Sequence, residues 1–291
     1  MIDFCYPGRT GESADSFGPI ITGSGNPSGK LRHVELIGEV AQGCGDSAAE
    51  RGKYGIDGGV IVIPVFGALE VGLASIVLWA IRHRKRGIAR LAGIVAMAGA
   101  GSAASYLYST SRGKFAVWAE VLDGLYLGGD ENVLDVGCGR GAVLLLAAHR
   151  LPEGRAVGAD IWRRQDQSGN SRAAAEHNAA VEGVRDRVDL VNADARDLPF
   201  RSASFDVVVS SLTIHNIPGS DGRRQALYEA VRVLRAGGRL RIVDLPNADW
   251  YPEVLRDAGC INVTVRRLDW RTWFGVPGHH QTLVAATKAY D

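Results

Sequence analysis

The chain has 291 residues, of which 46% are hydrophobic and 22% are charged, and its formal net charge at pH 7 is +1. This composition is that of a globular protein with one large domain, or one domain plus appendages. The nearly balanced charge gives no reason to expect a nucleic-acid partner. Four cysteines (Cys5, Cys44, Cys138 and Cys260) lie far apart without a CxxC or metal-ligand spacing. They are therefore interpreted as reduced thiols and not as a disulfide framework.

Residues 1–58 are rich in Gly, Ser, Pro and acidic residues and follow neither a helical nor a strand period. Such a segment is typical of a loop or a disordered tail. Its start has no basic segment followed by an apolar one, so we do not expect a signal peptide. The predicted domain organisation is therefore a tail over 1–58, a membrane anchor over 59–108 and an α/β domain over 109–291.

Two apolar runs form the predicted anchor. Val60–Ile81 is long enough to cross a bilayer as a helix, which takes about 20 residues. Its single charge, Glu70, either faces a neighbouring helix or is a functional carboxylate in the membrane. A buried helix of a soluble protein is the alternative interpretation of the whole run. The second run, Ile88–Tyr108, is dominated by small residues and has Arg90 near its start. It either returns across the membrane against the first helix or lies in the interface.

The pattern of apolar residues in the sequence changes after Ser109. Apolar residues at helical spacing in "KFAVWAEVLDGLYL" predict an amphipathic helix, and short apolar runs then alternate with helical patterns. This alternation is typical of βαβ units and a parallel sheet. At the end, "INVTVRRL" and "TLVAATKA" have no helical pattern between them. They predict an antiparallel hairpin at the edge of a doubly wound, Rossmann-like α/β sheet.

The segment "VLDVGCGRGA" runs from a predicted strand into a glycine-rich turn and then a helix. Gly137 and Gly139 let the backbone approach a ligand closely, and the turn follows the first strand, where open α/β sheets bind ligands. Asp160 ends the next strand, and a carboxylate there accepts hydrogen bonds from both ribose hydroxyls. These features predict a nucleoside site. Gly137, Gly139 and Ala142 also satisfy the dinucleotide fingerprint, so a hydride-transfer enzyme is one interpretation.

A second interpretation rests on more residues. From about Lys114 to its end the chain resembles the class I S-adenosylmethionine-dependent methyltransferases, whose D/E-x-G-x-G-x-G turn corresponds to Asp135, Gly137, Gly139 and Gly141. Three later segments follow in that family's order: "NADARDLPF", "FDVVVSSLTIHNI" and "EAVRVLRAGGRLRIVD". A hydride-transfer enzyme would not require them. The local sequence resembles ubiquinone, menaquinone and sterol methyltransferases. Arsenite methyltransferases share it but work through several cysteines, and this domain has only Cys138 and Cys260.

The resemblance implies a seven-stranded sheet, S-adenosylmethionine as cofactor and a set of binding residues. Asp160 would bind the ribose, Asp194 and Ala195 would lie beside the adenine, and Trp162 would lie against the adenine or the ribose. The full cofactor set that it implies is Asp135, Gly137, Cys138, Gly139, Gly141, Asp160, Ile161, Trp162, Asp194, Ala195 and Ser210.

The reaction that the resemblance implies is in-line SN2 transfer of a methyl group, in which proximity and alignment provide most of the catalysis. His215 is the best-placed candidate for a general base, since imidazole suits proton transfer near neutral pH. Alternatively, His215 and Asn216 only shape their loop or bind the cofactor. The polar insert 161–171 is either a lid over the cofactor or a solvated loop.

Aromatic residues are dense in the last third of the chain, and they either wall an acceptor pocket or pack under the final hairpin. Adjacent to them, His279 and His280 have no third ligand in view, so no metal is expected. The aromatic residues are Trp250, Tyr251, Trp270, Trp273 and Phe274.

These features together predict a membrane-anchored methyltransferase acting on a small or lipid-like acceptor, with a non-catalytic cofactor-binding or partner module as the alternative. The basic turn 82–87 favours the cytoplasm by the positive-inside rule, and the cofactor is made there too. We therefore expect Val60–Ile81 to cross once with the tail outside, Ile88–Tyr108 to lie in the interface, and the catalytic domain to face the cytoplasm. A true transmembrane hairpin is the second possibility.

Overall fold

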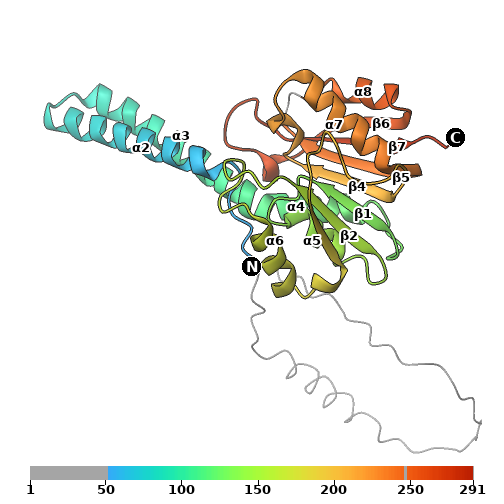
Figure 1. The fold of residues 1–291 in the computed structure, drawn as a ribbon. Coiled ribbons are helices and arrows are strands. Elements are labelled where there is room, and N and C mark those ends of the chain that lie inside the picture. Colours follow the sequence, from blue (N-terminus) through green and yellow to red (C-terminus); the bar gives the residue numbers. More distant parts are fainter. Residues whose placement is uncertain (1–51, 246–247, 291) are drawn as a thin grey trace, which may run out of the picture. The chain divides into compact units, whose positions relative to one another are not determined.

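The computed structural model describes residues 52–245 and 248–290, so the prediction of a tail lies outside the described residues as far as residue 51. Seven strands form one sheet in the order β3-β2-β1-β4-β5-β7-β6 (Figure 1). Strands β1 to β5 pair in parallel, whereas β7 is antiparallel to both β5 and β6. The strands are β1 (Asn132–Val136), β2 (Arg155–Asp160), β3 (Val188–Asn192), β4 (Phe205–Ser211), β5 (Leu234–Asp244), β6 (Cys260–Arg267) and β7 (Thr282–Lys288). The predicted α/β class and its antiparallel C-terminal hairpin are confirmed.

Helices cover both faces of the sheet, because its central strands are apolar on both sides. Val133 faces one buried cluster, which includes residues of α4, α5 and α6, while Leu134 faces a second cluster that includes α7 and α8. Burial of both faces is what near-continuous runs such as "FDVVVSS" require. These helices are α4 (Lys114–Asp123), α5 (Ala142–Ala148), α6 (Arg172–Val181), α7 (Ser220–Val233) and α8 (Tyr251–Asp257).

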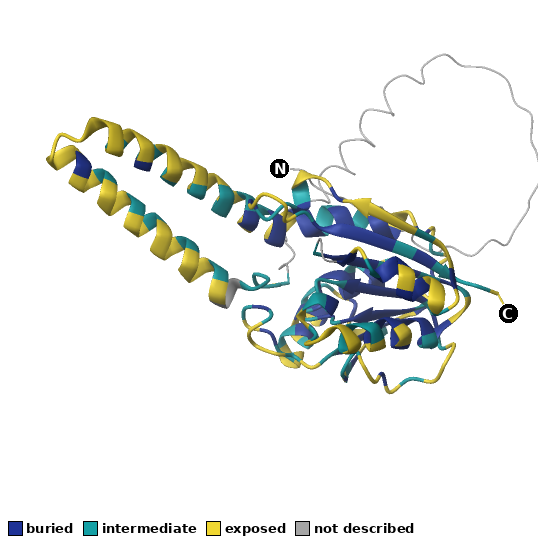
Figure 2. Ribbon diagram, turned by 90° about the horizontal axis from the view of Figure 1, so that it is seen from above, coloured by how far each residue is buried: buried dark blue, intermediate teal, exposed yellow. Residues whose placement is uncertain are grey.

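The two apolar runs form a helical hairpin, α2 (Gly59–Arg82) and α3 (Arg86–Tyr108), joined by the basic turn. Both helices are long and apolar enough to cross a membrane, although length and composition alone are weak evidence that they do. Their side chains are largely exposed, in contrast to the buried sheet (Figure 2). Glu70 faces α3 as expected, since a Cβ atom added to Gly99 would lie 2.1 Å from Glu70 Oε1.

The second helix does not end where its apolar run ends. It continues through one π-helical turn, Ser109–Gly113, into α4, whose Trp118 and Leu122 are buried in the core of the α/β domain. The loop between β6 and β7 packs on its last turns. Ser102 Oγ and Ser105 Oγ donate hydrogen bonds to backbone carbonyls in that loop, at 2.6 and 3.0 Å. The end of α3 is therefore fixed to the domain.

The beginning of α2 is also fixed to the domain, through residues 52–58, which we call the strap. The strap has no regular structure, as expected, but it is packed and hydrogen-bonded along its length. For example, Ile56 N donates to Ser168 Oγ (2.8 Å) and Ser168 N donates to the Ile56 carbonyl (3.1 Å). A single crossing by Val60–Ile81 would put the strap and the domain on opposite sides of a membrane. That expectation is wrong for this structure, because both ends of the hairpin contact the same domain.

Candidate active site

The glycine turn follows β1 at the point where the strand order reverses, between β1 and β4. Gly137, Gly139 and Gly141 all have positive φ, at 78°, 54° and 88°. At Gly137 the absence of a side chain is a packing requirement as well. An added Cβ would lie 2.0 Å from Thr213 Oγ1 and 2.6 Å from Thr213 Cβ. The turn therefore lies directly against the loop that leaves β4.

Asp160, at the end of β2, holds the turn in place. Its carboxylate accepts hydrogen bonds from Gly139 N (2.7 Å) and Trp162 N (2.5 Å). Trp162, which has a φ of 48°, in turn donates from its indole nitrogen to the Gly139 carbonyl at 2.9 Å. Trp162 thus supports the turn and does not line the pocket, where the sequence led us to expect it against the adenine or ribose.

Asp135, the first acid of the motif, is 1% exposed, and its Oδ1 has no hydrogen-bond partner within the described part of the chain. Burial, with a smaller contribution from the charge of Asp160, raises the pKa of Asp135 to about 8. Burial also raises the pKa of Asp160. An unpaired buried carboxyl is costly unless a donor reaches it, so this site fits a ligand that brings a cationic or hydrogen-bonding group.

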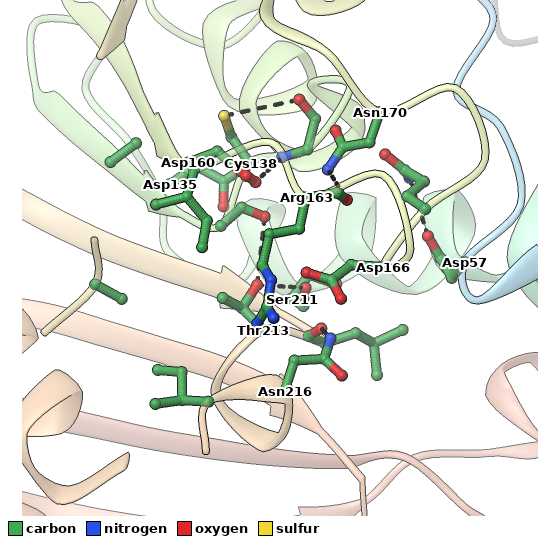
Figure 3. A pocket seen from close by; sticks show the side chains of 18 of the residues that line it. Asp57, Asp135, Cys138, Asp160, Arg163, Asp166, Asn170, Ser211, Thr213 and Asn216 are labelled. Carbon is green, nitrogen blue, oxygen red and sulfur yellow. Dashed lines mark hydrogen bonds between the residues drawn. The ribbon is translucent and has the colours of Figure 1, made fainter. Parts of the chain in front are cut away.

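These residues line a single pocket together with the segment after β3 and the loop after β4 (Figure 3). Asp194 and Ala195 line it beyond β3, as expected, and Arg196 forms an ion pair with Asp194 (2.6 Å) that lowers the pKa of Asp194. Of the other predicted cofactor residues, Gly137, Cys138, Gly139 and Ile161 also line the pocket. Burial raises the pKa of the Cys138 thiol, which is therefore neutral and unreactive.

Ser210 lies behind the pocket. It is 2% exposed, and its Oγ donates to the Val136 carbonyl at 2.9 Å, tying β4 to β1. Its neighbour Ser211 lines the pocket instead and accepts a hydrogen bond from Trp118 Nε1 at 3.0 Å. The motif places a serine in this strand, and the alternation of strand faces decides which of the two lines the pocket.

The insert 161–171 covers one side of the pocket and is itself held by the strap. Arg163, Asp166, Gln167 and Asn170 all line the pocket, and Figure 3 shows the Arg163 side chain extending into it. Ser171 caps the following helix by accepting a hydrogen bond from Ala174 N (3.1 Å). The insert is therefore both a cap for α6 and a wall of the pocket.

His215 lies in a short 3₁₀ turn after β4, and it does not line the pocket, whereas its neighbour Asn216 does. Its ring Nδ1 lies 2.5 Å from Asp244 Oδ1, at the end of β5. Asp244 is fully buried and also accepts hydrogen bonds from Tyr251 Oη (3.0 Å) and from His215 N (3.2 Å). An imidazole whose Nδ1–H is held by a carboxylate presents its lone pair on Nε2. The arrangement therefore suits a proton acceptor.

The aromatic residues of the last third pack and do not form a second pocket wall. Trp270 stacks on Tyr108 and Phe274 contacts Tyr106, so both meet the end of α3. Trp250 packs edge-on against the buried Tyr251. Trp273 Nε1 donates to the Val276 carbonyl at 2.8 Å. Within the described residues, no group of three or more His, Cys, Asp or Glu side chains forms a metal site.

A parallel sheet in this strand order, closed by an antiparallel seventh strand, with a glycine turn after β1 and an acid after β2, defines the Rossmann-like S-adenosylmethionine-dependent methyltransferases. Residues 134–242 match the family model described as "Methyltransferase domain". This part of the chain is thus a methyltransferase domain, and the cofactor of its class is S-adenosylmethionine.

Two curated proteins with similar sequences are also methyltransferases. A 27-O-demethylrifamycin SV methyltransferase from Amycolatopsis mediterranei is 37% identical over 116 residues, which are 39% of this chain and 38% of that protein. A ubiquinone/menaquinone biosynthesis C-methyltransferase from Dinoroseobacter shibae is 36% identical over 141 residues, 47% of this chain and 53% of that protein. The chain thus spans about half the length, or less, of these curated relatives.

One solved structure shows the same fold. It is a Galdieria sulphuraria protein assigned as a sarcosine dimethylglycine methyltransferase, with 13% identity and a TM-score of 0.50, and the match covers 62% of this chain and 87% of that one.

Proposed function

We propose that this protein is a membrane-anchored methyltransferase that transfers a methyl group from S-adenosylmethionine to a small or lipid-like acceptor. The observation that carries the proposal is the buried Asp135 Oδ1, which has no hydrogen-bond partner among the described residues and lies beside a glycine turn that Asp160 holds. The pocket offers buried carboxylates to the ammonium and the ribose hydroxyls of the cofactor, and Asp194, which lines the same pocket, would lie beside the adenine.

The chain's own residues would act mainly by positioning. When bound, S-adenosylmethionine supplies an electrophilic methyl group on a sulfonium. The glycine turn fixes the ligand's approach, and the insert 161–171 excludes water from one side of the pocket. Because the sulfonium loses its charge along the reaction path, the site needs no strong cation opposite it.

A proton has to leave when the acceptor atom is an O–H, N–H or acidic C–H. His215 would accept it at Nε2, while the buried carboxylate of Asp244 holds the ring and stabilises the resulting imidazolium. Asn216, which lines the pocket, would contact the cofactor or acceptor and does not carry a proton.

A binding measurement on the full chain tests whether the pocket binds the cofactor. We expect S-adenosylhomocysteine to bind the purified protein in detergent, and Asp160→Ala to lose about tenfold to hundredfold in affinity, as expected for hydrogen bonds to a charged group. Asp189→Ala is the matched control, since that exposed acid of β3 pairs with Arg155 away from the pocket. A wild-type protein that does not bind the ligand would refute the methyltransferase proposal.

The α2–α3 hairpin supports membrane anchoring, because large apolar residues are exposed along α2 and along the first half of α3. We propose that the hairpin inserts from the cytoplasmic side, where the cofactor is made, so that the basic turn reaches the far headgroup layer. This arrangement opposes the positive-inside rule, but it keeps both hairpin ends with the catalytic domain.

Cysteine labelling in intact cells tests whether the hairpin spans the membrane. In a Cys5→Ser, Cys44→Ser background, His83→Cys in the turn should react with a membrane-impermeant maleimide applied to intact cells. The same cysteine reacting only after the cells are opened would contradict a spanning hairpin with a cytoplasmic domain.

A further inference from the structure

The strap ends at the pocket, where Asp57 forms an ion pair with Lys114. Lys114 Nζ lies 2.9 Å from Asp57 Oδ2 and 3.1 Å from Oδ1. The Lys114 side chain is 6% exposed and that of Asp57 is 19% exposed, and both residues line the pocket. Tyr106, near the end of α3, donates a hydrogen bond to the Asp57 carbonyl. One residue therefore joins the pocket, the start of α2 and the end of α3.

A hydrogen-bond chain connects this ion pair to the glycine turn. Gln167 Nε2 donates to Asp57 Oδ1 at 3.0 Å, and Gln167 Oε1 accepts from Arg140 N at 3.1 Å. The same Oε1 lies so close to the turn that a Cβ on Gly139 would be 2.7 Å from it. The ion pair is thus one glutamine side chain away from the glycine turn, where the methionine part of the cofactor would bind.

That part of the cofactor is a zwitterion, with an ammonium and a carboxylate. Asp135 suits the ammonium, but the carboxylate needs a cation in a pocket with many acids. Three cations line the pocket: Arg196 is paired with Asp194, Arg163 is an exposed residue that extends into the pocket from the insert, and Lys114 is buried on a helix. A buried ammonium is strongly unfavourable without an anionic partner. Lys114 therefore holds either Asp57 or another carboxylate.

We propose that Lys114 binds the carboxylate of the cofactor, and that Asp57 competes for it as an internal anion that fastens the strap when no cofactor is bound. Cofactor binding then releases Asp57, and with it the strap to which both helices of the hairpin are joined. This inference rests on the proposed function, and it adds to that function a link between the pocket and the hairpin.

Two ligands and three variants of the full chain test the competition. S-adenosylhomocysteine carries the carboxylate, and S-adenosyl-3-thiopropylamine lacks only that group. We expect Lys114→Gln to lower the affinity for S-adenosylhomocysteine about tenfold to hundredfold, as for loss of a charged hydrogen bond. Asp57→Asn should raise this affinity about tenfold, because the competing anion is removed. Neither variant should change the affinity for the amine. Lys53→Gln is the control, since this exposed strap lysine bonds through its backbone.

Amide hydrogen exchange provides a readout of the strap itself. Saturation with S-adenosylhomocysteine should speed exchange at Ile56 and Ser168, whereas the amine should not. Slower exchange with S-adenosylhomocysteine would overturn the proposal, because the strap would then close over the cofactor. An unchanged ratio of the two affinities in Lys114→Gln would also overturn it. If the wild type bound neither ligand, the proposed function itself would fail.

Discussion

Replacement of Gly137 by alanine should destabilise the protein in two ways, through backbone strain and through a steric clash. Gly137 has a φ of 78°, and a left-handed conformation costs an L-residue about 1–2 kcal/mol. The new methyl group would also lie 2.0 to 2.6 Å from three atoms of Thr213, so the loop after β4 has to move. Overpacking of this kind costs about 1–3 kcal/mol more. We expect Gly137→Ala to lower the free energy of unfolding by about 2–5 kcal/mol.

Gly183 offers a matched control. Its φ is 70°, and a Cβ there would meet no atom within 4 Å, so Gly183→Ala introduces strain alone. We expect it to cost about 1–2 kcal/mol and to leave ligand affinity unchanged. Gly137→Ala should instead lower the affinity for S-adenosylhomocysteine about a hundredfold, which corresponds to about 3 kcal/mol of binding free energy.

Denaturant unfolding and titration calorimetry on the two variants measure both effects. Wild-type affinity in a folded Gly137→Ala protein would refute the assignment of this turn to the cofactor.

Three further predictions concern the acid, the base and the hairpin. Because burial holds the pKa of Asp135 at about 8, the free carboxyl is largely protonated near neutral pH, and a ligand ammonium favours its ionised form. Binding of S-adenosylhomocysteine should therefore release a proton, and affinity should rise from about pH 6 to about pH 8. Calorimetry in buffers of different ionisation enthalpy checks this, and Asp135→Asn should abolish the release. His215→Asn should lower kcat by about 10²-fold or more with ligand affinity unchanged; a fall in affinity alone would make His215 a binding residue. Gly99→Leu should separate α2 from α3 by displacing Glu70, seen as faster proteolysis of the hairpin than in Gly72→Leu, where an added Cβ would meet no atom of the described residues within 4 Å.

Periodicity and local motifs predicted the parts of the fold whose partners are near in sequence. The alternation of strands and helices predicted the parallel sheet, and the missing helical pattern between β6 and β7 predicted their antiparallel pairing. The glycine turn and Asp160 were predicted because a nucleoside site needs close backbone approach and an acid at adjacent strand ends.

The contacts of the strap and the pairing of His215 with Asp244 could not be predicted in the same way. Asp57 is 57 residues from Lys114 and 110 from Gln167, and nothing in the local pattern signals that they meet. Asp244 did carry a signal, since it is an acid at the carboxyl end of β5, beside the β4 exit that holds His215. For Trp162 the sequence did not indicate that the residue has a positive φ and that its indole donates to the Gly139 carbonyl.

The topology of the hairpin was mispredicted for a physical reason. The charge rule treats each apolar run as independent, but the contacts of the strap and of the end of α3 hold both runs to one domain. If the hairpin inserts into a membrane, both runs therefore have to insert together.

Transfer of a labelled methyl group from S-adenosylmethionine is the most direct test of the central claim. The full chain would be incubated with a total membrane extract and a soluble extract, with Asp160→Ala as the inactive control. The account predicts label in a small-molecule or lipid species, dependent on Asp160 and reduced in His215→Asn. Label only in soluble metabolites would contradict the lipid-like acceptor, and no transfer to either extract by a protein that binds the cofactor would contradict the methyltransferase activity itself.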